Sequence, residues 1–533
     1  MLGTVLRCWA LLGAVSAVHV AFIAPPASHY APMLPIAHGL LDDGHQVSFV
    51  GFDETVQKIK KLVPKAGLVG IGTSPFDREK MAPMQEFIQS VEYSKAQVFT
   101  SMAAPMLGNM MGGPMATGMK RQLKELKPDV LCVSFMYPIF YALGEVLDIP
   151  LVGIGWAAPS FLTVQIDLPW ATEPNVGSIH SRQEIYENPR LLVENTLVRI
   201  LGFLALRLGS TVNMWYRFQL GHPRPLEVWE FDSVLQHPLL LTSLPELSAG
   251  LPSLLGPYTF PVGILDHLAL EGSGMMKSDD QEKIMTWLDA QLAQKTKVLY
   301  VAFGSEVRVG KAHASLLVDA FQLGNFTVLW ATKVAPTVPV PEQVLVTKFA
   351  PQRAVLAHPA VFGFVSHGGM NSVNEALAFG KPMAIMPFFA DQMMVAAVHR
   401  DLGVAVLVNK NEATPQSLAE SWAIADQESI NTIASEAFQR RAAQIRKLNE
   451  ERKDMSRAVE VIVNQASGTF HLHVPPCPHI LIRCVPLFLT LLIWGACCNC
   501  CGCLRVRPQI PCACCRFVCC RSRKSRSGRK KQD

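Results

Sequence analysis

Residues 349–392 read FAPQRAVLAHPAVFGFVSHGGMNSVNEALAFGKPMAIMPFFADQ, and this stretch decides the fold. Its middle predicts a buried strand at 361–366, a turn at 367–369 and a helix at 370–379 that Gly380 ends. Strand, turn and helix in this order are the repeating unit of parallel α/β sheets. Because the glycines let backbone approach a ligand and the helix start carries free N–H groups, the turn also predicts an anion site.

Polar side chains lie around this turn at spacings that would bring them close together in the fold. Glu375 lies one helical turn beyond Asn371 on the same face, where a carboxylate can accept hydrogen bonds from ribose hydroxyls. Asp391 and Gln392 follow the next expected strand at its carboxyl end, a position suited to sugar hydroxyls. His367 can donate to phosphate oxygens. Each residue alone is common on a surface, but together they predict a site for a nucleotide-linked sugar.

Working outward, short apolar runs alternate with helical patterns, which predicts two doubly wound α/β halves. The expected strands are 18–24, 46–50, 130–134, 151–155, 298–303, 327–331, 344–348, 361–366, 383–387 and 404–408. A charged stretch with Gly and Ser at 266–281 predicts a linker, so the expected domains are 18–265 and 282–465. Two such halves leave a cleft at the carboxyl ends of their strands, where ligands bind.

Both ends of the chain carry targeting patterns. Residues 1–17 predict a secretory signal peptide, and 484–504 is an uncharged run of 21 residues, long enough to form a transmembrane helix. The tail 505–533 has ten basic residues and one acidic residue, which places it in the cytosol and the body in the lumen. Lys530 and Lys531 resemble a dilysine signal for the endoplasmic reticulum membrane; a plain polybasic segment is the alternative.

The cysteines are concentrated in the same region. Ten of the 14 lie between residues 497 and 520, so the body cannot contain a disulfide framework. Their position beside the expected span favours acylation. A second interpretation is a zinc site, because two CxxC pairs are present, formed by Cys500, Cys503, Cys512 and Cys515.

Composition excludes other classes of protein. The net charge of +5 is concentrated in the tail and leaves a mildly acidic body, which does not describe a nucleic-acid binder. No GxGxxG follows an expected strand, which argues against a dinucleotide-dependent dehydrogenase. The apolar segment 197–208 is too short and too charged to span a membrane; it predicts a helix on the membrane surface, a cover of the acceptor pocket, or core. The methionines of 102–119 predict either a flexible apolar pocket or core filling.

With these spacings, 349–392 resembles the signature of the family-1 UDP-glycosyltransferases, which include animal UDP-glucuronosyltransferases and plant glucosyltransferases. The stretches Trp287-Leu288-Asp289, Gly304-Ser305 and His29-x-x-Pro32-Met33-Leu34 also resemble family landmarks. The resemblance implies the GT-B fold, two Rossmann-like domains facing across a cleft. The UDP-sugar would bind the C-terminal half and the acceptor the N-terminal half.

The resemblance also implies roles for individual residues. Phe349, at a position that is usually Trp in the family, would stack on uracil, and Gln352 would hydrogen-bond it. The diphosphate would be held by four residues with a fifth nearby, namely His367, Gly369, Asn371, Ser372 and Ser305. Glu375 would bind the ribose, and Asp391 with Gln392 the sugar. The resemblance implies no metal and no cofactor, since the UDP-sugar is a co-substrate and the helix end with His367 would stabilise the leaving phosphate.

His29 follows the first strand and is expected to be the general base, because an imidazole with a pKa of about 6.5 can accept a proton at neutral pH. The family's supporting aspartate position falls on Ser134 here. Asp129 cannot replace it, because five strand residues at about 3.3 Å each put it at the opposite end. The usual dyad is therefore incomplete.

The function implied is the inverting, metal-independent transfer of a hexose from a UDP-sugar to a hydroxyl, or another nucleophile, of a small lipophilic acceptor. The alternative is a non-catalytic family member that binds UDP-sugar or lipid and regulates a partner. The sequence leaves open the acceptor, the sugar and whether the chain forms an oligomer.

Overall fold

The computed structural model describes residues 17–468 with gaps at 26–28, 76–89, 91, 94–111, 157–171, 173, 176, 224–235, 248–257, 266–277, 305–306, 308, 334, 337 and 424–431; in helices, the side chains of 202–212 and 278–279 are also left out. The chain divides into two compact units, 1–471 and 472–533, and all described residues belong to the first. The expected span 484–504, the tail, the signal peptide up to residue 16 and Ser305 therefore lie outside the described residues.

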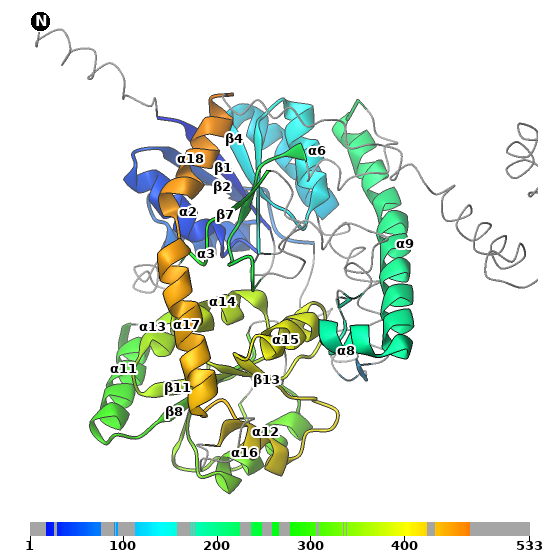
Figure 1. The fold of residues 1–533 in the computed structure, drawn as a ribbon. Coiled ribbons are helices and arrows are strands. Elements are labelled where there is room, and N and C mark those ends of the chain that lie inside the picture. Colours follow the sequence, from blue (N-terminus) through cyan, green and yellow to red (C-terminus); the bar gives the residue numbers. More distant parts are fainter. Residues whose placement is uncertain are drawn as a thin grey trace, which may run out of the picture. The chain divides into compact units, whose positions relative to one another are not determined.

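The first sheet is entirely parallel and has seven strands (Figure 1). In spatial order they are β3 (Gly67–Gly70), β2 (Gln46–Gly51), β1 (His19–Ala24), β4 (Val130–Ser134), β5 (Leu151–Gly155), β6 (Leu239–Leu241) and β7 (Thr259–Pro261). Its central strands are apolar and buried on both faces, as expected where helices cover both sides of a parallel sheet.

The second sheet repeats the same design with six parallel strands. In spatial order they are β10 (Val344–Thr347), β9 (Thr327–Ala331), β8 (Val298–Ala302), β11 (Val361–Ser366), β12 (Met383–Ile385) and β13 (Ala405–Leu407). In both sheets the chain starts in the middle, moves to one edge, and returns to build the other side. The reversal falls between β1 and β4 in the first sheet and between β8 and β11 in the second.

Helices connect the strands of each sheet. Those of the first half are α2 (Met33–Asp42), α3 (Asp53–Leu62), α6 (Pro138–Leu147), α8 (Arg182–Glu187) and α9 (Pro189–Leu220), with a further helix at 112–126. Those that follow are α11 (Ser278–Ala293), α12 (Lys311–Leu323), α13 (Gln352–Ala357), α14 (Met370–Ala378), α15 (Gln392–Asp401), α16 (Pro415–Trp422), α17 (Glu436–Arg452) and α18 (Met455–Ala466). No helix within the described ranges is long and apolar enough to cross a bilayer.

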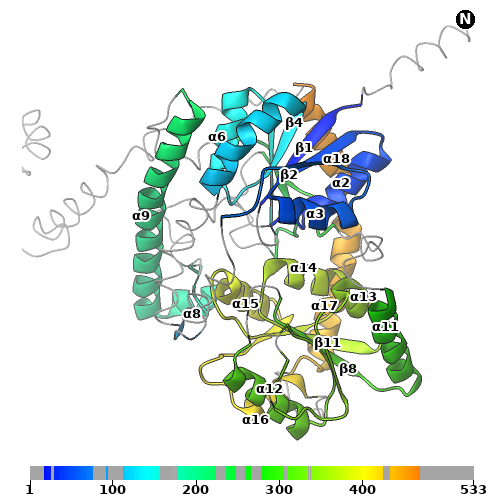
Figure 2. The same cartoon turned by 180° about the vertical axis from the view of Figure 1, so that it is seen from behind.

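The last helix, α18, completes the core of the first sheet rather than that of the second. Its buried Ala458, Val459 and Ile462 belong to the same apolar cluster as Val20 and Phe22 of β1. Figures 1 and 2 show α18 beside α2 and β1, while α17 runs beside α14. The end of the chain's second half is therefore part of the first half's core.

Most of the expected strands are confirmed, with ends within one or two residues. The sequence analysis missed β3, β6 and β7, which have three or four residues and no alternating pattern. The expected linker 266–281 was too long, because α11 already begins at Ser278. The acidic Asp280 near its start suits the positive end of a helix dipole. The segment 197–208 forms the middle of a much longer helix, α9.

The buried side chain of Asn449 in α17 connects this helix to the backbone of Ile264, near the end of the first half. Its Oδ1 accepts a hydrogen bond from Ile264 N at 2.7 Å, and its Nδ2 donates to Ile264 O at 3.1 Å. Asn449 is fully buried. This side chain therefore satisfies both backbone groups of a residue 185 positions away in sequence.

We predict that Asn449→Leu lowers the free energy of unfolding by about 2–4 kcal/mol, because it leaves a buried N–H and a buried C=O unpaired. Denaturant unfolding of the full chain in detergent measures this. The matched control Gln416→Leu, at an exposed position of α16, should change stability by less than about 0.5 kcal/mol. Equal effects of the two substitutions would contradict the anchoring role of Asn449.

Candidate functional site

The expected site residues gather where each sheet reverses its strand order. Ligands of open α/β sheets bind at this point, outside the carboxyl ends of the strands. In the second sheet His367 follows β11 and Gly304 follows β8, and a Cβ on Gly304 would lie 2.6 Å from His367 Cε1. In the first sheet His29 follows β1 and Ser134 ends β4. Both halves thus present their predicted residues at equivalent places.

The turn between β11 and α14 is shaped for a close backbone approach. Gly368 has φ of +85°, a left-handed conformation that side chains disfavour, and its N–H donates to Ser366 Oγ at 3.2 Å. Gly369 caps α14 without a side-chain hydrogen bond. An anion at this helix start would meet backbone N–H groups and the positive end of the dipole. Asn371 and Ser372 lie in the first turn of the same helix.

His367 is held neutral beneath this turn. It is 8% exposed, and burial lowers its pKa to about 4. Its Nδ1 is buried and has no hydrogen-bond partner within the described part of the chain. A neutral imidazole keeps one N–H that can donate to a phosphate oxygen. The burial of this ring depends on Gly304 and Gly369, which leave room for it.

A hydrogen-bonded group forms beside the start of α14. Gln352 Nε2 donates to Glu375 Oε2 at 2.7 Å and to Ser372 Oγ at 3.1 Å. Arg353 Nε pairs with Glu375 Oε1 at 3.1 Å, with both side chains largely shielded from solvent. The structure therefore brings together three predicted residues, and adds Arg353, whose ion pair the sequence analysis missed.

Phe349 lies next to this group and is 44% exposed, which is unusual for a large aromatic residue. Its carbonyl accepts a hydrogen bond from Thr347 Oγ1 at 2.8 Å, which fixes the backbone just after β10. An exposed ring on a fixed backbone can serve as a stacking surface for a planar ligand.

Asp391 ends the loop between β12 and α15, and Gln392 is the first residue of α15. Gln392 Oε1 accepts hydrogen bonds from Phe388 N at 2.9 Å and Phe389 N at 3.2 Å, so this amide orders its own loop. Burial raises the pKa of Asp391 to about 6. The preceding Ala390 has φ of +58°, a strained conformation of the kind that collects at functional sites.

Two groups of hydrogen bonds connect segments of the first half to the second half, and sequence reasoning missed both. Asn374 of α14 accepts from Ser243 Oγ at 3.2 Å and donates to Thr242 O at 3.3 Å. The hydroxyl of Tyr93 donates to Pro387 O at 2.8 Å and accepts from the backbone N of Lys410 at 3.2 Å. These partners are over 130 residues apart, so no local pattern predicts them.

His29 is half-buried, and its ring meets Tyr137 edge-on with centroids 5.6 Å apart. Ser134 is 3% exposed at the carboxyl end of β4. Asp129 lies at the other end, where its Oδ2 accepts from His19 N at 2.7 Å. The inference that Asp129 cannot support His29 is confirmed.

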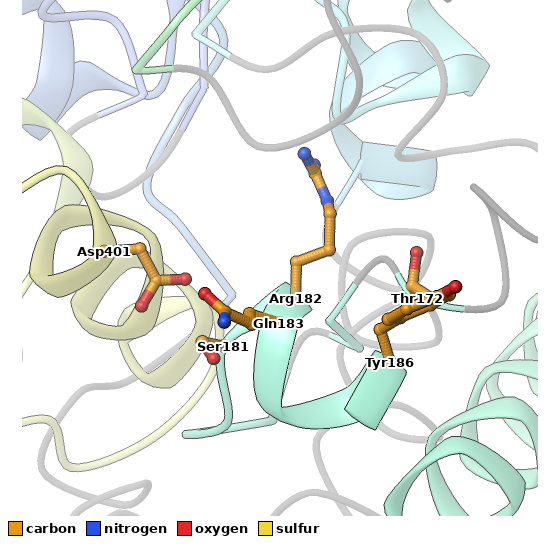
Figure 3. A pocket seen from close by; sticks show the side chains of 6 residues that line it. All are labelled: Thr172, Ser181, Arg182, Gln183, Tyr186 and Asp401. Atoms are coloured by element: carbon orange, nitrogen blue, oxygen red, sulfur yellow. The ribbon is translucent and has the colours of Figure 1, made fainter. Parts of the chain in front are cut away.

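Two cavities among the described residues are lined by residues other than these groups. One of about 520 Å³ is lined by Thr172, Ser181, Arg182, Gln183, Tyr186 and Asp401 (Figure 3). Another of about 330 Å³ is lined by Leu244, Pro245, Pro261, Gly263 and Arg452. None of the predicted site residues lines either one. Met115 and Met119 are fully buried in core, whereas Met102, Met106, Met110 and Met111 lie outside the described residues.

Comparison with known proteins identifies the second half. Residues 251–432 match the family described as "UDP-glucoronosyl and UDP-glucosyl transferase". The chain carries a domain of this family. UDP-glycosyltransferase 71C3 of Arabidopsis thaliana is 36% identical over 165 residues, 28% of this chain and 34% of that protein. Soyasaponin III rhamnosyltransferase of Glycine max is 25% identical over 417 residues, 74% of this chain and 84% of that protein.

Solved structures share the fold of the UDP-glycosyltransferase domain and of the half before it. The glycotransferase of kitacinnamycin has a TM-score of 0.57 at 18% identity, covering 84% of this chain and 99% of its own. LpCGTa in complex with UDP has a TM-score of 0.54 at 16% identity, covering 85% and 100%. The fold is that of the GT-B glycosyltransferases. The chain spans about a third of the length of the first curated relatives it matches, 34% and 37%.

We predict that Gly368→Ala weakens UDP binding by about tenfold or more, because a left-handed residue with a Cβ costs about 1–2 kcal/mol and shifts the start of α14. The added Cβ would lie 2.7 Å from Ile385 Cγ2 and 3.1 Å from Gln392 O. Calorimetric titration of the full chain with UDP measures the change. Gly310→Ala at the start of α12, where nothing lies within 4 Å, is the matched control and should bind UDP normally. Unchanged affinity in Gly368→Ala would exclude this turn from the site.

Proposed function

We propose that the protein transfers a hexose from a UDP-sugar to a hydroxyl of a small lipophilic acceptor, with inversion at the anomeric carbon. The observation that carries the proposal is the strand–turn–helix unit around Gly368, with neutral His367 below it and the Gln352–Glu375 pair beside it. The family of residues 251–432 and the UDP bound by LpCGTa support the choice of donor.

Donor binding is assigned as follows. Uracil stacks on Phe349 and hydrogen-bonds Gln352, whose orientation is set by Glu375 and Ser372. The ribose hydroxyls donate to Glu375. The diphosphate lies at the start of α14 against Gly369 and Asn371, with Ser305 as a further contact. Because these donors are held in place before the ligand arrives, little ordering is required on binding.

Asp391 and Gln392 bind the sugar in this proposal. Their loop is ordered by the hydrogen bonds of Gln392 to Phe388 N and Phe389 N, which leave the Gln392 amino group to donate to a hydroxyl. Ala390, with its left-handed φ, precedes Asp391 at the start of α15, and in this proposal the turn directs the Asp391 carboxylate toward the sugar.

The transfer is a single displacement. The acceptor hydroxyl gives its proton to His29 as its oxygen bonds to the anomeric carbon. The bond from that carbon to the β-phosphate oxygen breaks, and its electron pair stays on UDP. The N–H groups of α14 and the neutral His367 stabilise this growing charge, so the leaving group does not require a metal in this proposal.

A non-catalytic protein that binds UDP-sugar or lipid remains the second candidate, and Ser134 at the position of the supporting carboxylate favours it. Incubation with a panel of UDP-sugars and phenolic or alcoholic acceptors separates the two. Free UDP together with a product heavier by one hexose residue supports transfer. UDP-sugar binding without UDP release or product would establish the second candidate.

The cellular setting is also a proposal. The uncharged run 484–504 anchors the protein in the membrane of the endoplasmic reticulum, with the body luminal and the basic tail cytosolic. Protease added to sealed microsomes should then remove only the tail. Digestion of the body in the absence of detergent would show that the body faces the cytosol and would contradict the proposed orientation.

We predict that His29→Ala lowers kcat by roughly 10²–10⁴-fold, the usual contribution of a general base, while UDP affinity stays unchanged. Ser134→Asp should raise turnover of alcohols more than that of phenols, because a carboxylate stabilises the imidazolium that forms when a less acidic hydroxyl gives up its proton. Steady-state rates on paired acceptors measure both. Full activity in His29→Ala would assign the base to another residue.

We predict that the KM for the UDP-sugar rises as the pH falls through about 6, because Asp391 with its raised pKa becomes protonated and loses its negative charge for the sugar hydroxyls. Above that pH the carboxylate is ionised and KM should be constant. Asp391→Asn should raise KM at neutral pH and remove this pH dependence. A wild-type KM that is flat from pH 5 to about 7 would place Asp391 outside the sugar site.

A further inference from the structure

Helix α9 carries an apolar stripe that is exposed among the described residues and that the proposed reaction does not use. Its described members, called here the α9 stripe, are Val193, Leu197, Leu201, Trp215 and Phe218. Their exposed fractions are 59%, 55%, 42%, 61% and 68%. Side chains this large and apolar seldom line up at such exposure, since scattered single residues are the normal case.

The stripe follows one side of the helix. Positions 193, 197 and 201 are separated by four residues, and 215 returns to the same side after about four turns at 100° per residue. The opposite side is buried and includes Val198, Asn213 and Leu220. In Figures 1 and 2 no labelled helix or strand lies on the outer side of α9.

The length and the exposed apolar side chains of α9 fit a flat apolar surface. The helix is about 38 Å long from position 193 to position 218, at 1.5 Å per residue, and the described members of the stripe lie in its first and last parts. Helix α9 contains four arginines and one glutamate, and one of the arginines, Arg217, is buried beside His222. An exposed apolar face that includes a tryptophan is typical of helices that lie in the interface of a bilayer.

The rest of the chain argues for the same partner. Helix α18 ends at Ala466, and the uncharged run begins at residue 484. The intervening residues reach at most about 60 Å even when fully extended. Once the run 484–504 is inserted, the body stays close to the bilayer. Even a modest affinity of α9 for lipid is then enough to bring the helix onto the membrane surface.

We propose that the α9 stripe lies on the membrane surface, as a second contact besides the anchor, and so holds the body in one orientation on the bilayer. This rests on the membrane attachment proposed above. Apolar acceptors dissolved in the bilayer would then meet the body from a fixed side.

The test uses the tryptophan of the stripe as a probe. The full chain is reconstituted into vesicles of four parts phosphatidylcholine to about one part phosphatidylserine, an anionic surface. A parallel sample contains phosphatidylcholine with brominated acyl chains, which quench tryptophan on contact. The emission of Trp215 is obtained by subtracting the fluorescence of the Trp215→Phe variant from that of the wild-type protein. We expect brominated lipid to reduce this emission by about twofold or more, as for an interfacial helix.

The control places a tryptophan elsewhere on the surface. Leu323→Trp in the Trp215→Phe background puts the probe at a position of α12 that is 55% exposed, similar to Leu197. This tryptophan should not be quenched. Phe218→Ser in the wild-type background should reduce the quenching of Trp215 while leaving UDP binding unchanged, which excludes misfolding as the cause.

Two results would overturn the proposal. Equal emission of Trp215 in both lipids means that water, a second copy of the chain or the run 484–504 lies on the stripe instead of lipid. Equal quenching of Trp215 and of the α12 probe means that the contact is not specific to α9. Flotation of the vesicles reports separately whether the chain is attached to them.

Discussion

At Gly368 the chain must adopt a left-handed turn, because β11 ends and α14 begins within three residues at the point where the sheet reverses. This constraint determines where the predicted site residues of the second half lie. It directs the helix start toward the strand ends, leaves His367 beneath the turn, and brings α14 against α13, where Gln352 meets Glu375. The neutral state of His367 follows from the same close packing, since burial lowers its pKa.

The two halves use the same topology for different chemistry. In the second half the reversal point holds glycines and helix N–H groups, which suit an anion. In the first half it holds His29, Ser134 and Tyr137, with aromatic packing around a half-buried imidazole. Buried polar contacts such as Asn374 to Thr242 connect α14 with the end of β6. Loss of one such partner is costly, because the other is left unpaired in the interior.

The sequence predicted those features that depend on neighbours along the chain. Strands of five or six apolar residues were found within one or two positions, and the spacing of Asn371 and Glu375 on one helix was readable. The three-residue strand β6 was not predicted, because the three leucines of Leu239–Leu241 show no alternation that distinguishes a strand from a helix. The burial of His367 and the contact of Tyr93 with Pro387 depend on segments brought together only by folding.

The return of α18 has a consequence for synthesis on the ribosome. β4 is complete at Ser134, but the helix that covers this face of the sheet begins only at Met455. At about 5–20 residues per second, that interval lasts roughly 15–60 s. During this time the apolar cluster around Val20 and Phe22 lacks its last layer. The nascent first half therefore has a period of vulnerability to aggregation that ends only when nearly all of the described chain has been made.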